Sequence, residues 1–144
     1  MIFGQYSHTI DDKNRLSLPS KWKKIFGKSV VLTRGLDSCL FMYTATEWKK
    51  IAQTLATTSL GSKDARDLNR FFLSGAVEIG VDKNGRILVP EFLAEFSKLG
   101  NKIVFAGLYN RAEIWNESVW EKKQIEVSKS ADAVAEKLQD IGMI

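Results

Sequence analysis

The sequence has little of the residue types on which cross-linking and much of catalysis depend. Its 144 residues include one cysteine, Cys39, and one histidine, His8. A single cysteine cannot form an internal disulfide, and alone it cannot build a zinc site. His8 lies inside an alternating apolar and polar segment, which favours a structural role. We therefore expect Cys39 to be a packing residue, and we expect no metal ion.

Long apolar segments are also missing. No stretch approaches about 18 consecutive apolar residues, which excludes a membrane-spanning helix. The opening residues Met-Ile-Phe-Gly-Gln-Tyr include no basic segment that leads into an apolar one, so we expect no signal peptide. Because an unpaired cysteine is typical of a reducing compartment, we expect a cytoplasmic protein.

Motifs for catalysis are absent as well. The sequence has no glycine-rich phosphate loop and no serine in a nucleophile-elbow setting. Glu117 and Glu121 lie four residues apart on an expected helix and indicate a solvated surface. We expect no enzyme, no cofactor and no small-molecule substrate. A small hydrolase that uses scattered carboxylates stays open as a third reading.

Positive charge is concentrated near the N-terminus. The net charge is +4, but residues 1–35 alone hold seven cations against Asp11 and Asp12. The cations are Lys13, Arg15, Lys21, Lys23, Lys24, Lys28 and Arg34. Such a local basic stripe attracts polyanions more strongly than the total charge suggests. A solvated face without a partner is the alternative.

The sequence contains an internal repeat. Residues 8–19, HTIDDKNRLSLP, align with residues 79–90, IGVDKNGRILVP, at an offset of 71. The offset pairs Asp11 with Asp82, Arg15 with Arg86 and Pro19 with Pro90. A repeated acid and a repeated arginine give two equivalent surfaces in one molecule. Two such surfaces suit a periodic partner better than a single small substrate.

Each repeat predicts the same order of elements. In the first repeat we expect strands at 6–10, 15–18, 29–33 and 40–43, and helices at 19–26 and 45–56. In the second we expect strands at 77–81, 86–89, 102–106 and 112–115, a short helix after Pro90, and a helix at 117–127. A helix at 63–73 links the repeats, and a final helix is expected near 131–141. Thr44 with Glu47 forms a capping box, and Asn116 caps the helix that follows it.

This order indicates an α+β fold of two tandem βαββα repeats. Because a lone two-stranded hairpin is marginally stable, the repeats are expected to pair their strands across a pseudo-twofold axis in one β-barrel. The expected organisation is a first repeat at 1–56, a linker and connecting helix at 57–75, a second repeat at 76–128 and a C-terminal helix at 129–144. Trp48 and Trp120 recur at matching positions and are expected to be core or interface anchors.

The repeated acid and arginine have two readings. An aspartate that opens a tight turn can accept turn N–H groups or pair with the arginine four residues on. A guanidinium held by a carboxylate is oriented in advance for phosphate or for the O6 and N7 atoms of guanine. A structural turn with an internal salt bridge stays open, whereas a calcium loop around Gly85 is disfavoured by Gly80 at its first position. The DNA-binding candidates are Lys13, Asn14, Arg15, Lys21, Lys23, Lys24, Lys83 and Arg86, with Asp11 and Asp82 supporting the turns.

Two copies of Asp-x-x-x-Arg, each followed by an apolar strand and proline, resemble the MraZ family of bacterial transcriptional regulators. The first motif is Gly4-x-Tyr6-x-His8-x-Ile10-Asp11-x-Lys13-x-Arg15-Leu16-x-Leu18-Pro19. The second is Val81-Asp82-x-x-Gly85-Arg86-Ile87-x-Val89-Pro90. The resemblance covers nearly the whole chain, and the doubled motif is far more specific than either copy alone.

The resemblance implies an AbrB-like swapped-hairpin barrel with peripheral helices, assembled into rings of about eight or more subunits. It also implies binding of double-stranded DNA at repeated promoter boxes of the division and cell-wall gene cluster, including the chain's own operon, and hence association with the nucleoid. Because Asn14 stands where the second repeat has Gly85, the two turns are expected to differ. The second repeat also lacks a basic short helix, so the first is expected to supply most of the DNA affinity.

The leading hypothesis is therefore a sequence-specific DNA-binding regulator. The alternative is a ring-forming scaffold that has only non-specific affinity for nucleic acid. Under the leading hypothesis the second repeat is expected to serve mainly in folding or in subunit contacts.

Overall fold

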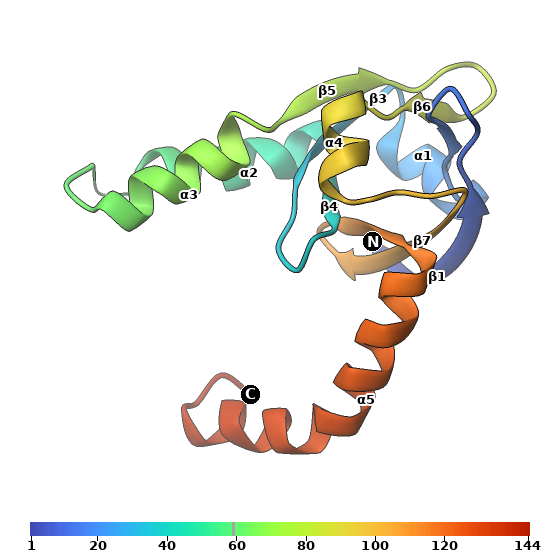
Figure 1. The fold of residues 1–144 in the computed structure, drawn as a ribbon. Helices are drawn as coiled ribbons and strands as arrows, with labels where there is room; N and C mark the ends of the chain where they lie inside the picture. The colour runs from blue at the N-terminus through green and yellow to red at the C-terminus, as the bar shows by residue number, and fades with distance from the viewer. Residues whose placement is uncertain (59) are drawn as a thin grey trace.

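The computed structural model describes residues 1–58 and 60–144 and confirms a mixed α+β architecture (Figure 1). The strands are β1 (Ile2–Thr9), β2 (Arg15–Ser17), β3 (Ser29–Arg34), β4 (Leu40–Tyr43), β5 (Val77–Gly80), β6 (Arg86–Leu88), β7 (Lys102–Tyr109) and β8 (Ala112–Asn116). The helices are a 3₁₀ turn η1 (Ser20–Trp22), α1 (Lys23–Phe26), α2 (Ala45–Ala56), α3 (Lys63–Leu73), α4 (Glu91–Phe96) and α5 (Glu117–Asp140). Within the described residues, no helix has the length and apolar character needed to cross a membrane.

The two repeats complete each other's sheets. Six strands form an antiparallel sheet in the order β1-β7-β8-β4-β3-β5, and β2 pairs with β6 in a separate two-stranded ribbon. Strand β1 of the first repeat pairs with β7 of the second, and β5 of the second pairs with β3 of the first. Leu16 lies opposite Ile87, its counterpart at the offset of 71, so the pseudo-twofold axis passes between them. The predicted pairing across the repeats is confirmed.

The main core fills the space between the sheet and the ribbon. Leu16 and Ile87 point inward from the ribbon, and both are buried. Trp22, which is 2% exposed, meets Tyr6 at 5.2 Å and Phe105 at 5.7 Å between ring centroids, both edge to face. Large aromatic side chains bury the most apolar area per residue, so this cluster contributes strongly to the stability of the barrel.

A second, smaller core lies on the outer side of β4 and β8. Tyr43 contacts Trp48 of α2 at 5.6 Å, and Trp115 contacts Trp120 of α5 at 5.5 Å. The helices that follow each repeat's last strand thus cover their own sheet face through equivalent tryptophans. Trp48 and Trp120 are core anchors, as the sequence predicts.

Helix α5 is a single element of 24 residues, so the expectation of separate helices at 117–127 and 131–141 is wrong. The intervening Ser128-Lys129-Ser130 contains neither glycine nor proline, and nothing there terminates a helix. The Ser130 hydroxyl donates to the carbonyl of Glu126 at 3.0 Å, a contact that accompanies helix bending. Figure 1 shows that α5 leaves the barrel and then changes direction.

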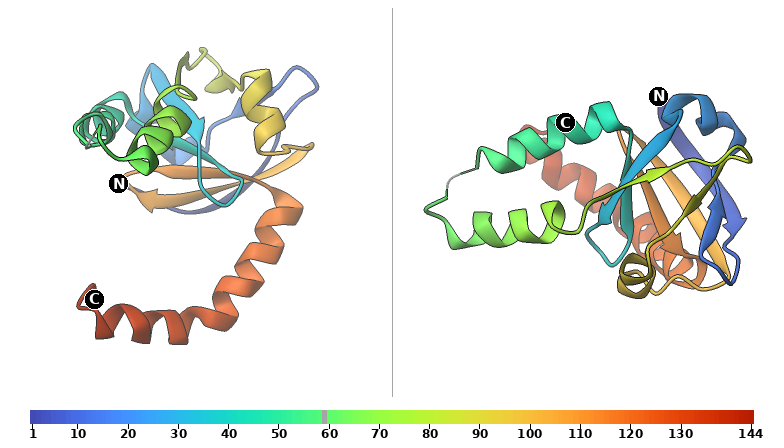
Figure 2. Two further views of the ribbon diagram at one scale, coloured as in Figure 1. Left: turned by 60° about the vertical axis from the view of Figure 1, so that its left-hand side comes forward. Right: turned by 90° about the horizontal axis from the view of Figure 1, so that it is seen from above.

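Helices α2 and α3 form a hairpin that projects from the barrel in a direction different from that of α5 (Figure 2). The bounds of α2 and α3 agree with the prediction because their start signals are local. Thr44 accepts the N–H of Glu47 at 3.1 Å, and Ser62 accepts the N–H of Ala65 at 3.2 Å.

The other differences from the prediction are small. Strands β1 and β7 are longer than predicted because they pair over eight residues. The first short helix is divided into η1 and α1.

Candidate nucleic-acid interface

The turn between β1 and β2 is closed by the Asp11 carboxylate. Its Oδ1 accepts the backbone N–H groups of Lys13 at 2.9 Å and Arg15 at 2.8 Å. Its Oδ2 accepts from Nε of Arg15 at 2.8 Å. Asn14 donates its backbone N–H to the Asp11 carbonyl at 3.0 Å and adopts φ of 60°. One side chain therefore fixes both the turn and the direction of the arginine.

The turn between β5 and β6 repeats this arrangement. Asp82 accepts the backbone N–H groups of Asn84 at 2.8 Å and Arg86 at 3.0 Å, and its Oδ2 accepts from Nε of Arg86 at 3.3 Å. Gly85 has φ of 75°, close to that of Asn14. The expectation that the two turns differ is wrong for the backbone, because asparagine is one of the few residues that tolerate left-handed dihedrals.

The same contacts favour the ionised form of both aspartates. The pKa of Asp11 lies below its ordinary value, chiefly because the Arg15 backbone N–H binds the carboxylate and also because the Arg15 side chain does. The pKa of Asp82 is lowered in the same way by the backbone N–H and side chain of Arg86. At neutral pH each arginine is therefore paired with a charged partner. Within the described chain, no group of three or more His, Cys, Asp or Glu side chains is arranged to hold a metal ion.

Acid should weaken both turns. A carboxyl whose pKa is lower in the folded chain than in the unfolded chain stabilises the fold at pH values above 3.8, its ordinary pKa. This contribution is lost as the pH falls through the pKa of the folded state. We expect the urea midpoint of the wild type to fall more steeply below pH 3.8 than that of Asp11→Asn/Asp82→Asn. The control Asp132→Asn/Asp140→Asn changes two charges on α5 and should keep the wild-type profile. An Asp11→Asn/Asp82→Asn profile parallel to the wild type over this range would contradict the prediction.

The two turns adjoin opposite ends of the β2–β6 ribbon. Leu18 donates its N–H to the Gly85 carbonyl at 3.0 Å, and Val89 donates to the Asn14 carbonyl at 2.8 Å. Arg15 lies opposite Leu88, and Ser17 lies opposite Arg86. Since alternate residues of a strand face opposite sides, these four residues share the face that points away from the core. The Arg15 and Arg86 side chains are 39% and 33% exposed.

At this site the short helix of each repeat lies against the turn of the other repeat. Lys23 of α1, in the first repeat, lies against Gly85 of the second turn, so close that a Cβ at residue 85 would be 2.7 Å from its Nζ. Asn14 of the first turn instead donates from Nδ2 to Oε2 of Glu91 at 3.2 Å. The basic helix of the first repeat thus adjoins the second turn, and the acidic start of α4 adjoins the first. The interface is a composite of both halves.

Both halves of the chain match one family. The family model described as "MraZ protein, putative antitoxin-like" matches residues 1–71 and again residues 72–141. The chain belongs to the MraZ family.

Relatives of similar length share this assignment. The chain is 46% identical over 143 residues to a protein of Caldanaerobacter subterraneus subsp. tengcongensis named Transcriptional regulator MraZ, a match that covers 99% of this chain and all of that protein. A protein of Thermoanaerobacter sp. (strain X514) with the same name is also 46% identical, and one of Clostridium tetani is 40% identical, with the same coverage. The resemblance to the MraZ family that the repeated motif suggests is therefore confirmed.

The remaining candidate residues of this MraZ-family chain lie near the ribbon and differ in how far their side chains are exposed. Lys13 and Lys83 are exposed in the two turns, and Lys21 and Lys24 are exposed on the short helical segment after β2. Asn14 and Lys23 are half-buried because they contact Glu91 and Gly85. The exposed side chains are free to reach a phosphate, whereas these two lie against the opposite repeat.

Sequence reasoning missed two residues of the outward ribbon face, Ser17 and Leu88. Each lies two positions after one of the arginines, so the alternation of a strand was the available signal. Leu88 lies in the strand predicted at 86–89, and it is 57% exposed. Both belong to the same surface as the arginines.

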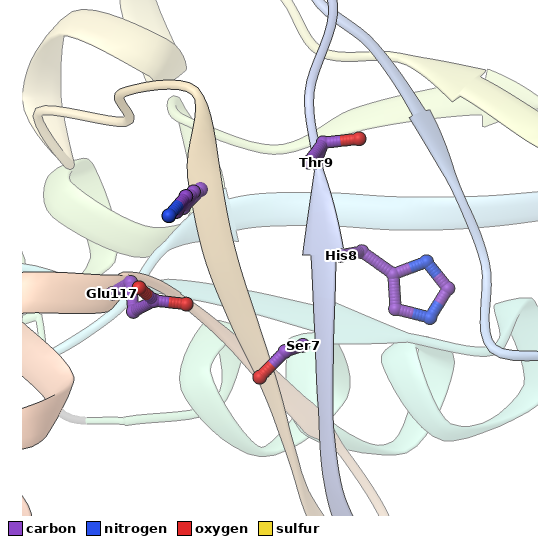
Figure 3. A pocket seen from close by; sticks show the side chains of 5 residues that line it. Ser7, His8, Thr9 and Glu117 are labelled. Atoms are coloured by element: carbon purple, nitrogen blue, oxygen red, sulfur yellow. The ribbon is translucent and has the colours of Figure 1, made fainter.

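His8 does not form an acid–base site. Its ring packs edge to face on Phe105 at 5.5 Å, and its pKa is lowered by partial burial and by the nearby Lys23. Ser7, His8, Thr9, Lys102 and Glu117 line a hollow beside β1. Figure 3 shows the imidazole pointing away from Ser7 and Glu117. The structural role predicted for His8 agrees with these contacts.

Proposed function

We propose that the protein is a sequence-specific DNA-binding transcriptional regulator. The observation that carries the proposal is the outward face of the β2–β6 ribbon, where two arginines are oriented by Asp11 and Asp82. The major groove of B-DNA admits a two-stranded β-ribbon, and arginine bound to O6 and N7 of guanine is the commonest specific contact there. Relatives named Transcriptional regulator MraZ support the same role.

In this mechanism the arginines contact bases and the lysines contact phosphates. Arg15 and Arg86 contact base edges, while the exposed lysines at positions 13, 21, 24 and 83 neutralise phosphates and fix the position of the ribbon. Because the aspartates already orient the arginine side chains, each arginine loses less conformational entropy on binding, and this smaller loss raises the affinity. Lys23 supports the second turn, and Asn14 supports the first.

The proposed targets are the repeated promoter boxes of the division and cell-wall gene cluster, including the protein's own operon, so the protein acts in the cytoplasm at the nucleoid. One ribbon contacts few base pairs, so a ring of about eight or more subunits bound to several boxes would gain affinity through multivalency. Both parts of this proposal extend what the motif resemblance to the MraZ family implies.

The test compares the promoter fragment with a scrambled fragment of equal length and composition. We expect tighter binding to the promoter and a footprint over its repeated boxes. Equal affinity for the two fragments would reject sequence-specific regulation in favour of a scaffold that binds nucleic acid non-specifically.

Replacing Lys24 should weaken binding to every sequence. Lys24→Ala removes an exposed cation beside the ribbon, and a lost phosphate contact reduces the slope of log K against log salt by about 0.9. We expect the promoter and the scrambled fragment to lose affinity by the same factor. The matched control is Lys49→Ala on α2, which removes the same charge elsewhere and should leave the slope unchanged. A loss confined to promoter DNA would contradict a phosphate contact.

A further inference from the structure

The outward face of the ribbon departs from the twofold symmetry of the chain at one pair of positions. Arg15 and Arg86 are equivalent, but the residue two positions later is Ser17 in one strand and Leu88 in the other. Leu88 is 57% exposed, whereas its strand neighbours Ile87 and Val89 are each 1% exposed. The leucine therefore adds little to the core and places apolar surface in the middle of a basic face.

The surroundings of Leu88 indicate what covers it. It lies directly opposite Arg15, and cross-strand neighbours have Cβ atoms about 4.5–5.5 Å apart. Arg86 precedes it by two residues on the same face. Both neighbours are arginines that keep partly exposed guanidinium groups beside their aspartate partners, and the exposed Lys13 and Lys83 lie in the adjoining turns. A polyanion is therefore a better match for this face than an apolar protein surface.

We propose that Leu88 contacts the C5-methyl group of a thymine beside the base that Arg15 contacts. In the major groove the thymine methyl is the one apolar group that distinguishes a base pair, and aliphatic side chains recognise it by contact. Leu88 is then a specificity residue. At the other end of the ribbon, the equivalent position offers the DNA a hydrogen-bonding hydroxyl, that of Ser17. This inference rests on the proposed function and adds a determinant that neither arginine supplies.

The experiment removes each side of the proposed apolar contact in turn. The full-length wild type is titrated against promoter DNA in which deoxyuridine, which lacks only the C5-methyl, replaces each thymine of the boxes one position at a time. We expect about a fourfold loss of affinity at one position in the box, the size expected for one buried methyl group. Leu88→Ala should lose about as much on unmodified DNA and should not distinguish thymine from deoxyuridine there.

Ser17→Ala, at the equivalent position of the other strand, is the matched control and should keep the full sensitivity to deoxyuridine. Leu88→Ala should keep the wild-type slope of log K against log salt, because leucine neutralises no phosphate.

The inference is overturned if the wild type tolerates deoxyuridine at every position, or if Leu88→Ala stays as sensitive to deoxyuridine as the wild type. It is also overturned if Leu88→Ala alters only self-association, which would assign Leu88 to a protein contact. Failure of the wild type to prefer the promoter would reject the proposed function itself.

Discussion

Replacing both Arg15 and Arg86 with alanine should abolish the preference for promoter DNA over scrambled DNA. Each arginine that contacts a guanine edge is worth about 1–3 kcal/mol. The two together are therefore worth about 2–6 kcal/mol, or roughly thirtyfold to twenty-thousandfold in affinity. Promoter binding should fall to the level of the scrambled fragment, while a weak, salt-dependent affinity from the lysines persists. Fluorescence anisotropy titrations on both fragments measure the effect.

The single variants decide how the two repeats share recognition. A larger loss for Arg15→Ala than for Arg86→Ala would support the prediction that the first repeat supplies most of the affinity. Equal losses would reject it and would agree with the composite site, in which Lys23 supports the second turn. Arg70→Ala removes a guanidinium on α3 that is 68% exposed, so it is the control for charge. If the double variant retained the promoter preference, the ribbon would not be the recognition surface.

Replacing Trp22 with alanine should remove a large part of the stability of the fold. A buried tryptophan truncated to alanine typically costs about 3–5 kcal/mol, because the apolar contacts are lost and a cavity remains. A domain of this size is stable by only about 5–15 kcal/mol in total. Trp22 contacts Tyr6 from β1 and Phe105 from β7, so the loss extends across both repeats. Urea unfolding followed by far-UV circular dichroism gives the change in unfolding free energy.

The control for Trp22 is Phe3→Ala, which removes an aromatic ring that is 67% exposed on β1. Surface substitutions of this kind usually change stability by no more than about 0.5 kcal/mol. If Trp22→Ala unfolded at the same urea concentration as Phe3→Ala, the packing described for the main core would be wrong.

The sequence predicted best those elements whose signals are local. Thr44 and Glu47 mark the start of α2, and the hydrogen bond from the Glu47 N–H to Thr44 confirms that cap. The two turns were located because an aspartate and an arginine four residues apart can bind each other without help from the rest of the chain. The full length of β1 was not predicted, because its first residues become a strand only by pairing with β7, about 100 residues away in sequence.

The candidate site was predicted in its parts but not in its assembly. An offset of 71 identifies equivalent residues, but it does not say which helix adjoins which turn. The exchange that brings Lys23 to Gly85 and Glu91 to Asn14 depends on the pairing of β2 with β6. Leu88 was missed although strand alternation places it on the same face as Arg86, because the motif left position 88 unspecified.

The interlocked pairing of the two repeats has a consequence for how such a chain could arise. A half-length ancestor with this pattern would leave β1 and β2 without partners, and one edge of β3 unpaired, unless a second identical chain supplied the missing strands. Such an ancestor would therefore have been an obligate homodimer, with identical residues at both ends of its ribbon. Gene duplication and fusion into one polypeptide would free the two halves to diverge, as the serine at 17 and the leucine at 88 illustrate.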